Sequence, residues 1–166
     1  MKQITAYRFK NLIALFLILP GSLHLNAQSF IYSKTVSCKE IIFSANDDFS
    51  IIKQLTSSDT NCWDPVVSPD GKYIAYFKGN FEYAADLWVM ETDGENAKRL
   101  TFDVINWSSH PSWHPDGRQI LYESASTTDK FESFIRSVNI DGTNHRILIN
   151  NTGDHDRFPC MNPSDT

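Results

Sequence analysis

The sequence predicts an all-β fold, an incomplete β-propeller of about three blades, with two full four-stranded blades and a partial blade at each end. The first observation is a repeat, because the turn Pro69-Asp70-Gly71 returns 46 residues later as Pro115-Asp116-Gly117. The second is the absence of any sustained 3.6-residue apolar period after the first 27 residues, while short segments rich in aromatic and β-branched residues abound. A four-stranded unit that repeats about every 40 to 50 residues has the size of a propeller blade.

The first full unit is predicted to contain four strands joined by tight turns. The expected strands are Pro65–Ser68, Lys72–Phe77, Asp86–Glu91 and Asn96–Thr101, with a loop over Gly79–Ala85. The turn before the second strand has residue types that suit its geometry: Pro69 presets φ, Asp70 hydrogen-bonds to nearby backbone, and Gly71 accepts a positive φ. Asp93-Gly94 is a hairpin signal between the last two strands.

The second unit follows the same order, and shorter copies flank the two full ones. Its expected later strands are Gln119–Ser124, Phe134–Asn139 and Asn144–Ile149, with Asp141-Gly142 as the hairpin turn. A half-blade, Glu40–Thr56, precedes the first unit, and a decayed copy of the Pro-containing segment runs from Phe158 to Asp165. The outermost strands repeat as Lys53-Gln54-Leu55-Thr56, Lys98-Arg99-Leu100-Thr101 and Arg146-Ile147-Leu148-Ile149. We therefore divide the chain into a partial blade at 28–58, blades at 59–105 and 106–153, and the start of another at 154–166.

The segments SPDGKYIAYF…DLWVMETDGENAKRLT and HPDGRQILY…NIDGTNHRIL resemble the WD40-like PD40 repeats of the TolB-type propeller family. The resemblance covers Asp59 to Asp165. It implies a repeat protein that binds other proteins in the periplasm of a Gram-negative bacterium, with envelope proteins as partners, such as the peptidoglycan-associated lipoprotein that TolB binds. The chain departs from the pattern at Phe134–Asn139, which lacks a leading aspartate, and at Ser164-Asp165, where Asp-Gly is expected.

The number of predicted blades is too small for a closed propeller. Propellers close with four to eight blades, so a chain with about three looks like a truncated or partial member of the family. Self-association that completes the ring is one expected outcome, and loss of order at the two ends is the other.

Residues 1–27 have the layout of a secretory signal peptide. Three basic residues precede Asn11, Leu12–Leu19 is a continuous apolar run, and Leu25-Asn26-Ala27 fits a cleavage site. The run is far shorter than the roughly 20 residues that span a bilayer. We expect a mature chain that starts at Gln28 in the periplasm or outside the cell, with no membrane insertion after cleavage.

The charge of the chain argues against one class of partner, and its cysteine count limits the number of disulfide bridges. The chain has 15 Lys and Arg against 20 Asp and Glu, a net charge of −5, and no basic cluster. Because phosphate neutralisation supplies much of the affinity for nucleic acids, this composition argues against a nucleic-acid partner. The three cysteines, Cys38, Cys62 and Cys160, allow at most one bridge within the chain. A Cys38–Cys62 bridge and three unpaired thiols both remain open.

The sequence contains no catalytic or cofactor motif. It has no GxSxG elbow, no GxGxxG and no P-loop. His110 and His114 are four residues apart in a predicted strand and are expected on the same face, but the matching residues of the first unit are Asp64 and Ser68, which favours a scaffold role over a metal site. Asp70 and Asp116 are interpreted as turn formers. We expect no enzyme activity, no cofactor and no metal.

Aromatic residues define the candidate interaction surface. Trp88 and Trp113 lie within predicted strands and are expected to pack between blades. Trp63 and Trp107 precede the first strand of each full unit, where the chain crosses from one blade to the next. With Asp64, His110 and Arg157 they could form a protein- or peptide-binding surface at one end of the propeller channel, although local packing of the two tryptophans is an equal alternative.

Two functions follow from these expectations. The first is an exported, non-catalytic, TolB-like propeller segment that mediates protein–protein interaction in the cell envelope. The second is the propeller portion of an exported prolyl-oligopeptidase-like peptidase or of a polysaccharide lyase, with the catalytic part outside this sequence.

Overall fold

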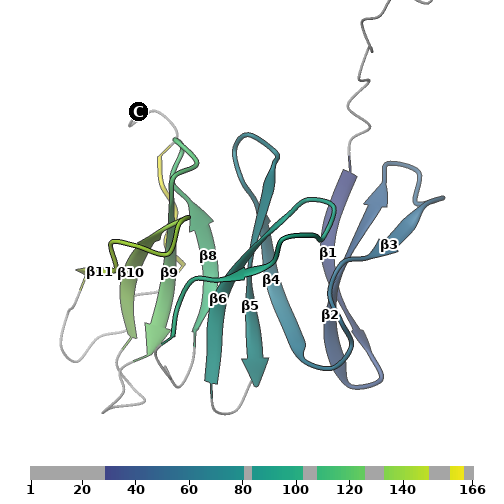
Figure 1. The fold of residues 1–166 in the computed structure, drawn as a ribbon, viewed down its shortest axis with the longest axis horizontal. Coiled ribbons are helices and arrows are strands. Elements are labelled where there is room, and N and C mark those ends of the chain that lie inside the picture. Colours follow the sequence, from purple (N-terminus) through teal and green to yellow (C-terminus); the bar gives the residue numbers. More distant parts are fainter. Residues whose placement is uncertain (1–28, 81–83, 103–107, 126–132, 150–157, 163–166) are drawn as a thin grey trace, which may run out of the picture.

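The computed structural model describes residues 29–80, 84–102, 108–125, 133–149 and 158–162. These residues form eleven strands in three antiparallel sheets and contain no helix. In Figure 1 the three sheets stand side by side in chain order, from the sheet that contains β1 at one side to the sheet that contains β11 at the other. This arrangement is the predicted incomplete propeller. No described segment forms a helix with the length and apolar character needed to cross a bilayer.

The first sheet has three strands and the other two have four each. The first contains β1 (Ser29–Val36), β2 (Lys39–Asn46) and β3 (Ile52–Gln54) in that order. The second contains β4 (Asn61–Val67), β5 (Tyr73–Asn80), β6 (Ala84–Glu91) and β7 (Lys98–Arg99). The third contains β8 (Ser108–Trp113), β9 (Gln119–Ala125), β10 (Ser133–Asn139) and β11 (Arg146–Ile149). The predicted strands of both full units are therefore present, with their ends shifted by a few residues.

Strand β1 is an addition that the sequence analysis missed. It pairs with β2 along its whole length, with Tyr32 opposite Phe43. The connecting turn is Ser37-Cys38, with φ values of 50° and 64°. Two consecutive positive φ values normally favour Asn-Gly, and Ser-Cys gives no such signal. At the other end, residues 158–162 are not in a strand, so the described part of the decayed copy does not extend a sheet. The predicted signal peptide and the last turn fall on residues 1–28 and 163–166, outside the described residues.

Two apolar layers hold the sheets together. The layer between the first and second sheets contains Ile42, Cys62, Ile74, Tyr76 and Met90. The layer between the second and third sheets contains Trp63, Ala75, Phe77, Ala85, Leu87, Val89, Leu100, Trp113, Ile120, Tyr122 and Val138. Strand β5 contributes to both layers, because successive side chains point to opposite faces. That is why its sequence is a continuous apolar run instead of an alternating one.

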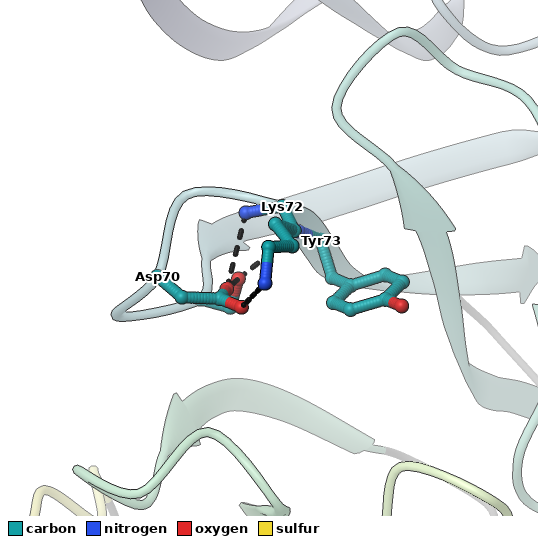
Figure 2. A network of polar contacts seen from close by, with 4 residues as sticks. Asp70, Lys72 and Tyr73 are labelled. Atoms are coloured by element: carbon teal, nitrogen blue, oxygen red, sulfur yellow. Dashed lines mark hydrogen bonds and ion pairs between the residues drawn. The ribbon is translucent and has the colours of Figure 1, made fainter.

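The Pro-Asp-Gly turns begin the second strand of each full sheet. Gly71 has a φ of +73° and its N–H donates to the carbonyl of Ser68 at 2.9 Å. The Asp70 carboxylate accepts hydrogen bonds from the Ser68 hydroxyl at 2.7 Å and from the Lys72 N–H at 3.1 Å, and it pairs with Lys72 Nζ at 3.1 Å (Figure 2). The Ser68 hydroxyl, followed by the contacts from Lys72, lowers the pKa of Asp70 to about 2. Gly117 repeats the turn with a φ of +70°.

Candidate functional site

Three X-Pro dipeptides, one from each repeat, share an unusual backbone. They are Asp64-Pro65 in β4, His110-Pro111 in β8 and Phe158-Pro159 in the decayed copy. The residue before each proline has a positive φ, of 49°, 54° and 54° respectively. A residue before proline normally adopts an extended backbone. Each departure costs on the order of 1–3 kcal/mol, and strain of this kind clusters at functional sites.

Two of these dipeptides lie in β-bulges. The register of β4 on β5 shifts between Trp63 and Val66, and that of β8 on β9 shifts between Ser109 and Ser112. A bulge interrupts the alternation of side chains and turns one of them in a new direction. The repeated bulge therefore re-aims Asp64 and His110 relative to the rest of their strands.

His110 connects the three repeats. Its backbone N–H donates to Asp64 Oδ2 at 3.1 Å, and its ring lies against the ring of Phe158 with centroids 4.2 Å apart at 55°. Its Nδ1 is 3.3 Å from Oε2 of Glu123, whose side chain is fully buried. The imidazole thus stands between a buried carboxyl group and an exposed aromatic ring.

The three X-Pro dipeptides line a shallow recess of about 440 Å³ that is largely open to solvent. We call it the X-Pro recess; its lining is Asp64, Pro65, Val66, His110, Pro111, Phe158, Pro159 and Cys160. Its walls are mostly apolar, with the Asp64 carboxylate and the His110 imidazole as polar groups. A concave apolar site with a few convergent polar groups is the usual form of a binding pocket.

Some of the predicted surface residues meet here and others do not. Asp64 and His110 lie together, with the backbone N–H of His110 donating to Asp64 Oδ2. Trp63 is only 8% exposed and stacks on Phe77 with centroids 6.3 Å apart, so its role is local packing and it adds no exposed aromatic surface. Trp107 and Arg157 lie outside the described residues. The aromatic group of the site is Phe158, which the sequence analysis did not select although Phe158-Pro159 repeats the X-Pro pattern.

The expectation that His110 and His114 share a face assumed a regular strand. His110 lies in the bulge and His114 follows the end of β8, so the alternation of a regular strand does not relate their side chains. His114 belongs to the turn instead, with Nδ1 2.9 Å from Asp116 Oδ1. Within the described ranges, no group of three or more His, Cys, Asp and Glu side chains is placed to hold a metal ion.

The two strand tryptophans pack as expected. Trp113 is buried and its Nε1–H donates to the carbonyl of Val66 at 2.9 Å, which joins the second and third sheets. Trp88 packs against the layer between the first and second sheets, with Lys78 Nζ 4.6 Å from its ring centroid.

All three cysteines are free thiols in the structure. Cys38 is exposed in the β1–β2 turn, Cys62 is buried in β4 and Cys160 is exposed at the X-Pro recess. The structure therefore corrects the Cys38–Cys62 pairing and agrees with the alternative of three unpaired thiols. Burial raises the pKa of the Cys62 thiol.

Comparison with known proteins finds partial relatives. No protein-family profile matches the chain. The uncharacterized peptidase YuxL of Bacillus subtilis (strain 168) is 39% identical over 66 residues, 40% of this chain and 10% of that protein. The uncharacterized protein Atu1656 of Agrobacterium fabrum is 30% identical over 84 residues, 50% of this chain and 28% of that protein. The chain thus spans less than a third of the length of each of these two relatives.

Solved structures match over most of this chain. A putative TolB from Agrobacterium tumefaciens gives a TM-score of 0.66 at 21% identity, over 75% of this chain and 46% of that one. TolB from Acinetobacter baumannii gives a TM-score of 0.59 at 20% identity, over 74% of this chain and 30% of that one. A prolyl endopeptidase structure gives a TM-score of 0.55 at 23% identity, over 77% of this chain and 22% of that one. These likenesses show a TolB-like β-propeller fold, found in proteins that are all longer than this chain.

Proposed function

We propose that this chain is an exported, non-catalytic β-propeller segment that binds a peptide or protein loop in the X-Pro recess. One observation carries the proposal: three separate repeats adopt the same strained X-Pro backbone, and the residues so placed line a single recess. Asp64 and His110 are only partly buried and Phe158 is exposed, so the strained positions are accessible to a ligand. Strain that persists at an accessible site is consistent with ligand binding.

The lining indicates the chemistry of the ligand. The carboxylate of Asp64 can accept hydrogen bonds from a protonated amine or a guanidinium group. Such hydrogen bonds between charged groups are stronger than those between neutral groups. The Phe158 ring and the three prolines offer an apolar wall to an aliphatic or aromatic side chain. We therefore expect a peptide with a basic group next to an apolar residue.

Selection from a peptide library tests this function. The mature chain, residues 28–166, is immobilised and a phage-displayed library of randomised octapeptides is selected on it. Selected peptides are synthesised and their dissociation constants are measured by fluorescence anisotropy. We expect basic-apolar pairs to be enriched, and we expect His110→Ala and Asp64→Asn to weaken binding by at least about tenfold, the usual effect of losing a central contact.

His114→Ala is the matched control. His114 lies only four residues from His110, but it contacts Asp116 in the turn instead of the recess. It should leave the dissociation constant unchanged. Equal losses in the two histidine variants would locate binding elsewhere, and a library that yields no binder would remove the proposed function.

Envelope localisation belongs to the same proposal. The TolB-like fold and the signal-peptide pattern of residues 1–27 support a periplasmic or secreted protein in a Gram-negative bacterium, with an envelope protein such as a peptidoglycan-associated lipoprotein as partner. Mass spectrometry of the periplasmic fraction should find a mature N-terminus at Gln28. An intact Met1 in the cytosolic fraction would contradict export.

The alternative is the propeller portion of an exported peptidase or polysaccharide lyase. The name of YuxL and the match to a prolyl endopeptidase favour this second candidate. Sequencing of the coding DNA beyond the Thr166 codon separates the two, because a GxSxG-bearing domain in frame would identify a peptidase. A panel of peptide, ester and glycan substrates should give no turnover with the present chain.

A further inference from the structure

Glu123 is a buried acidic residue at a position where the first full unit has an apolar one. Counted from the turn glycines Gly117 and Gly71, Glu123 stands in β9 where Phe77 stands in β5. Phe77 is fully buried in the layer between the second and third sheets. The Glu123 side chain is equally inaccessible, with 0% exposed. Burial of a carboxylate costs free energy unless a hydrogen-bond partner compensates it, so an acid is costly here compared with the phenylalanine of the first unit.

The residues opposite these two positions differ in the same way. In the second sheet Phe77 lies opposite Trp63 and stacks on it, with ring centroids 6.3 Å apart. In the third sheet Glu123 lies opposite Ser109. An aromatic pair of the first unit is thus replaced by a serine and an acid in the second. The ring that meets Glu123 is that of the next residue, His110.

The bulge in β8 allows this contact. Residues that lie opposite each other on antiparallel strands share a face of the sheet, as Ser109 and Glu123 do. In a regular strand His110 would therefore point to the other face. The register shift between Ser109 and Ser112 interrupts the alternation, and His110 Nδ1 lies 3.3 Å from Glu123 Oε2. The contact joins the interior of the sheet to a ring that is 35% exposed and lines the X-Pro recess.

The pairing determines which ring nitrogen carries the proton. A carboxylate only accepts hydrogen bonds, and in a neutral imidazole the hydrogen bond made by one nitrogen fixes the role of the other. We propose that Glu123 is a positioning residue that holds the proton of His110 on Nδ1, so that Nε2 is the acceptor for an N–H donor of the ligand. This inference rests on the proposed binding function of the recess and deepens it. The Asp64 carboxylate and the His110 imidazole then both accept, which selects a ligand group with several N–H donors, a protonated amine or a guanidinium group.

The position of the proton can be measured without a ligand. The ¹⁵N chemical shifts of the imidazole nitrogens are recorded for residues 28–166 in slightly alkaline buffer, where histidine is ordinarily neutral. The signals of His110 are identified by their absence in His110→Ala. We expect a protonated Nδ1 and an unprotonated Nε2. Glu123→Leu removes the acceptor and should move protons to Nε2, whereas Glu123→Gln keeps an acceptor oxygen and should preserve the proton on Nδ1.

Binding of the selected octapeptides by the same variants tests the role of this proton. Glu123→Leu should raise their dissociation constants by at least about tenfold, as expected for loss of a central contact. Glu123→Gln should stay within about threefold of the wild-type chain, because the hydrogen bond to Nδ1 is retained. Phe77→Leu is the matched control, since it places a leucine at the equivalent position of the first unit, away from the recess lining. It should change neither the shifts of His110 nor the affinity.

The possible failures are distinguishable. A proton on Nε2 of His110 in the wild-type chain would overturn the role of Glu123 and leave the proposed binding function standing. Full-strength binding by Glu123→Leu would also overturn it, and so would equal weakening by Glu123→Leu and Glu123→Gln, because an acceptor oxygen would then not suffice. A library that yields no binder would remove the proposed function, whereas the ¹⁵N shifts alone still decide whether Glu123 holds the proton on Nδ1.

Discussion

The ring of His110 lies 4.2 Å from the ring of Phe158, centroid to centroid, although the two residues come from different repeats. Both residues have a positive φ, and each precedes a proline. In a regular extended strand, successive side chains alternate between the two faces of the sheet. Here the side chains of His110 and Phe158 both lie at the X-Pro recess.

Phe158 should matter little for stability. Its side chain is 64% exposed, so Phe158→Ala should change the free energy of unfolding by no more than about 0.5 kcal/mol, as for other surface substitutions. Phe77→Ala is the contrast, because Phe77 is fully buried between the second and third sheets and its removal should cost about 3–5 kcal/mol. Urea unfolding measures both. A large loss for Phe158→Ala would make this ring part of the core and weaken its assignment to a binding site.

The Pro-Asp-Gly turn should tolerate some residues at Gly71 and reject others. No atom lies within 4 Å of a Cβ built at this glycine, so only its φ of +73° restricts the choice. Gly71→Val places a β-branched residue at positive φ and should cost roughly 1–3 kcal/mol of unfolding free energy. Gly71→Asn should cost much less, because asparagine adopts this backbone more readily. Equal unfolding midpoints for the two variants would contradict the turn geometry.

Asp70 should contribute to the pH dependence of stability. Its pKa falls from 3.8 to about 2 on folding, mainly through the hydrogen bond from the Ser68 hydroxyl. A lowered folded-state pKa means that the charged form stabilises the fold above about pH 4, and that this contribution disappears as the pH falls to about 2. Asp70→Asn removes the titration but keeps an acceptor oxygen. The wild-type chain should therefore lose more unfolding free energy than this variant between pH 5 and pH 2; identical profiles would contradict the assignment.

The Trp113 hydrogen bond should strengthen the junction between the second and third sheets. Trp113→Phe removes the donor to the Val66 carbonyl, a bond of 2.9 Å. Loss of one partner of a largely buried hydrogen bond should cost about 1–3 kcal/mol. Trp88→Phe is the matched control, since the contact seen at this ring is Lys78 above its face and exposed cation–π contacts are worth about 0.5–1 kcal/mol. Thermal unfolding that ranks the two variants in the opposite order would contradict this role.

The sequence was sufficient for the repeated sheets but not for the recess. Turn residues such as Asp70-Gly71 act through local geometry, so their positions predicted where β5 begins. The positive φ of Asp64 and His110 runs against the local preference before proline. It depends on packing between repeats, which no local pattern encodes. Strand β1 was missed for a similar reason, since the Ser37-Cys38 turn has the backbone of an Asn-Gly hairpin without its residues.

Alkylation of Cys160 tests the binding site most directly. Cys160 is exposed at the X-Pro recess, Cys38 is exposed in the distant β1–β2 turn, and Cys62 is buried. The mature chain is treated with iodoacetamide with and without a saturating selected octapeptide, and the rate at each cysteine is followed by peptide mass spectrometry. A ligand in the recess predicts slower alkylation of Cys160 with no change at Cys38. Unchanged alkylation of Cys160 under saturating peptide, or equal slowing at both cysteines, would contradict the X-Pro recess as the binding site.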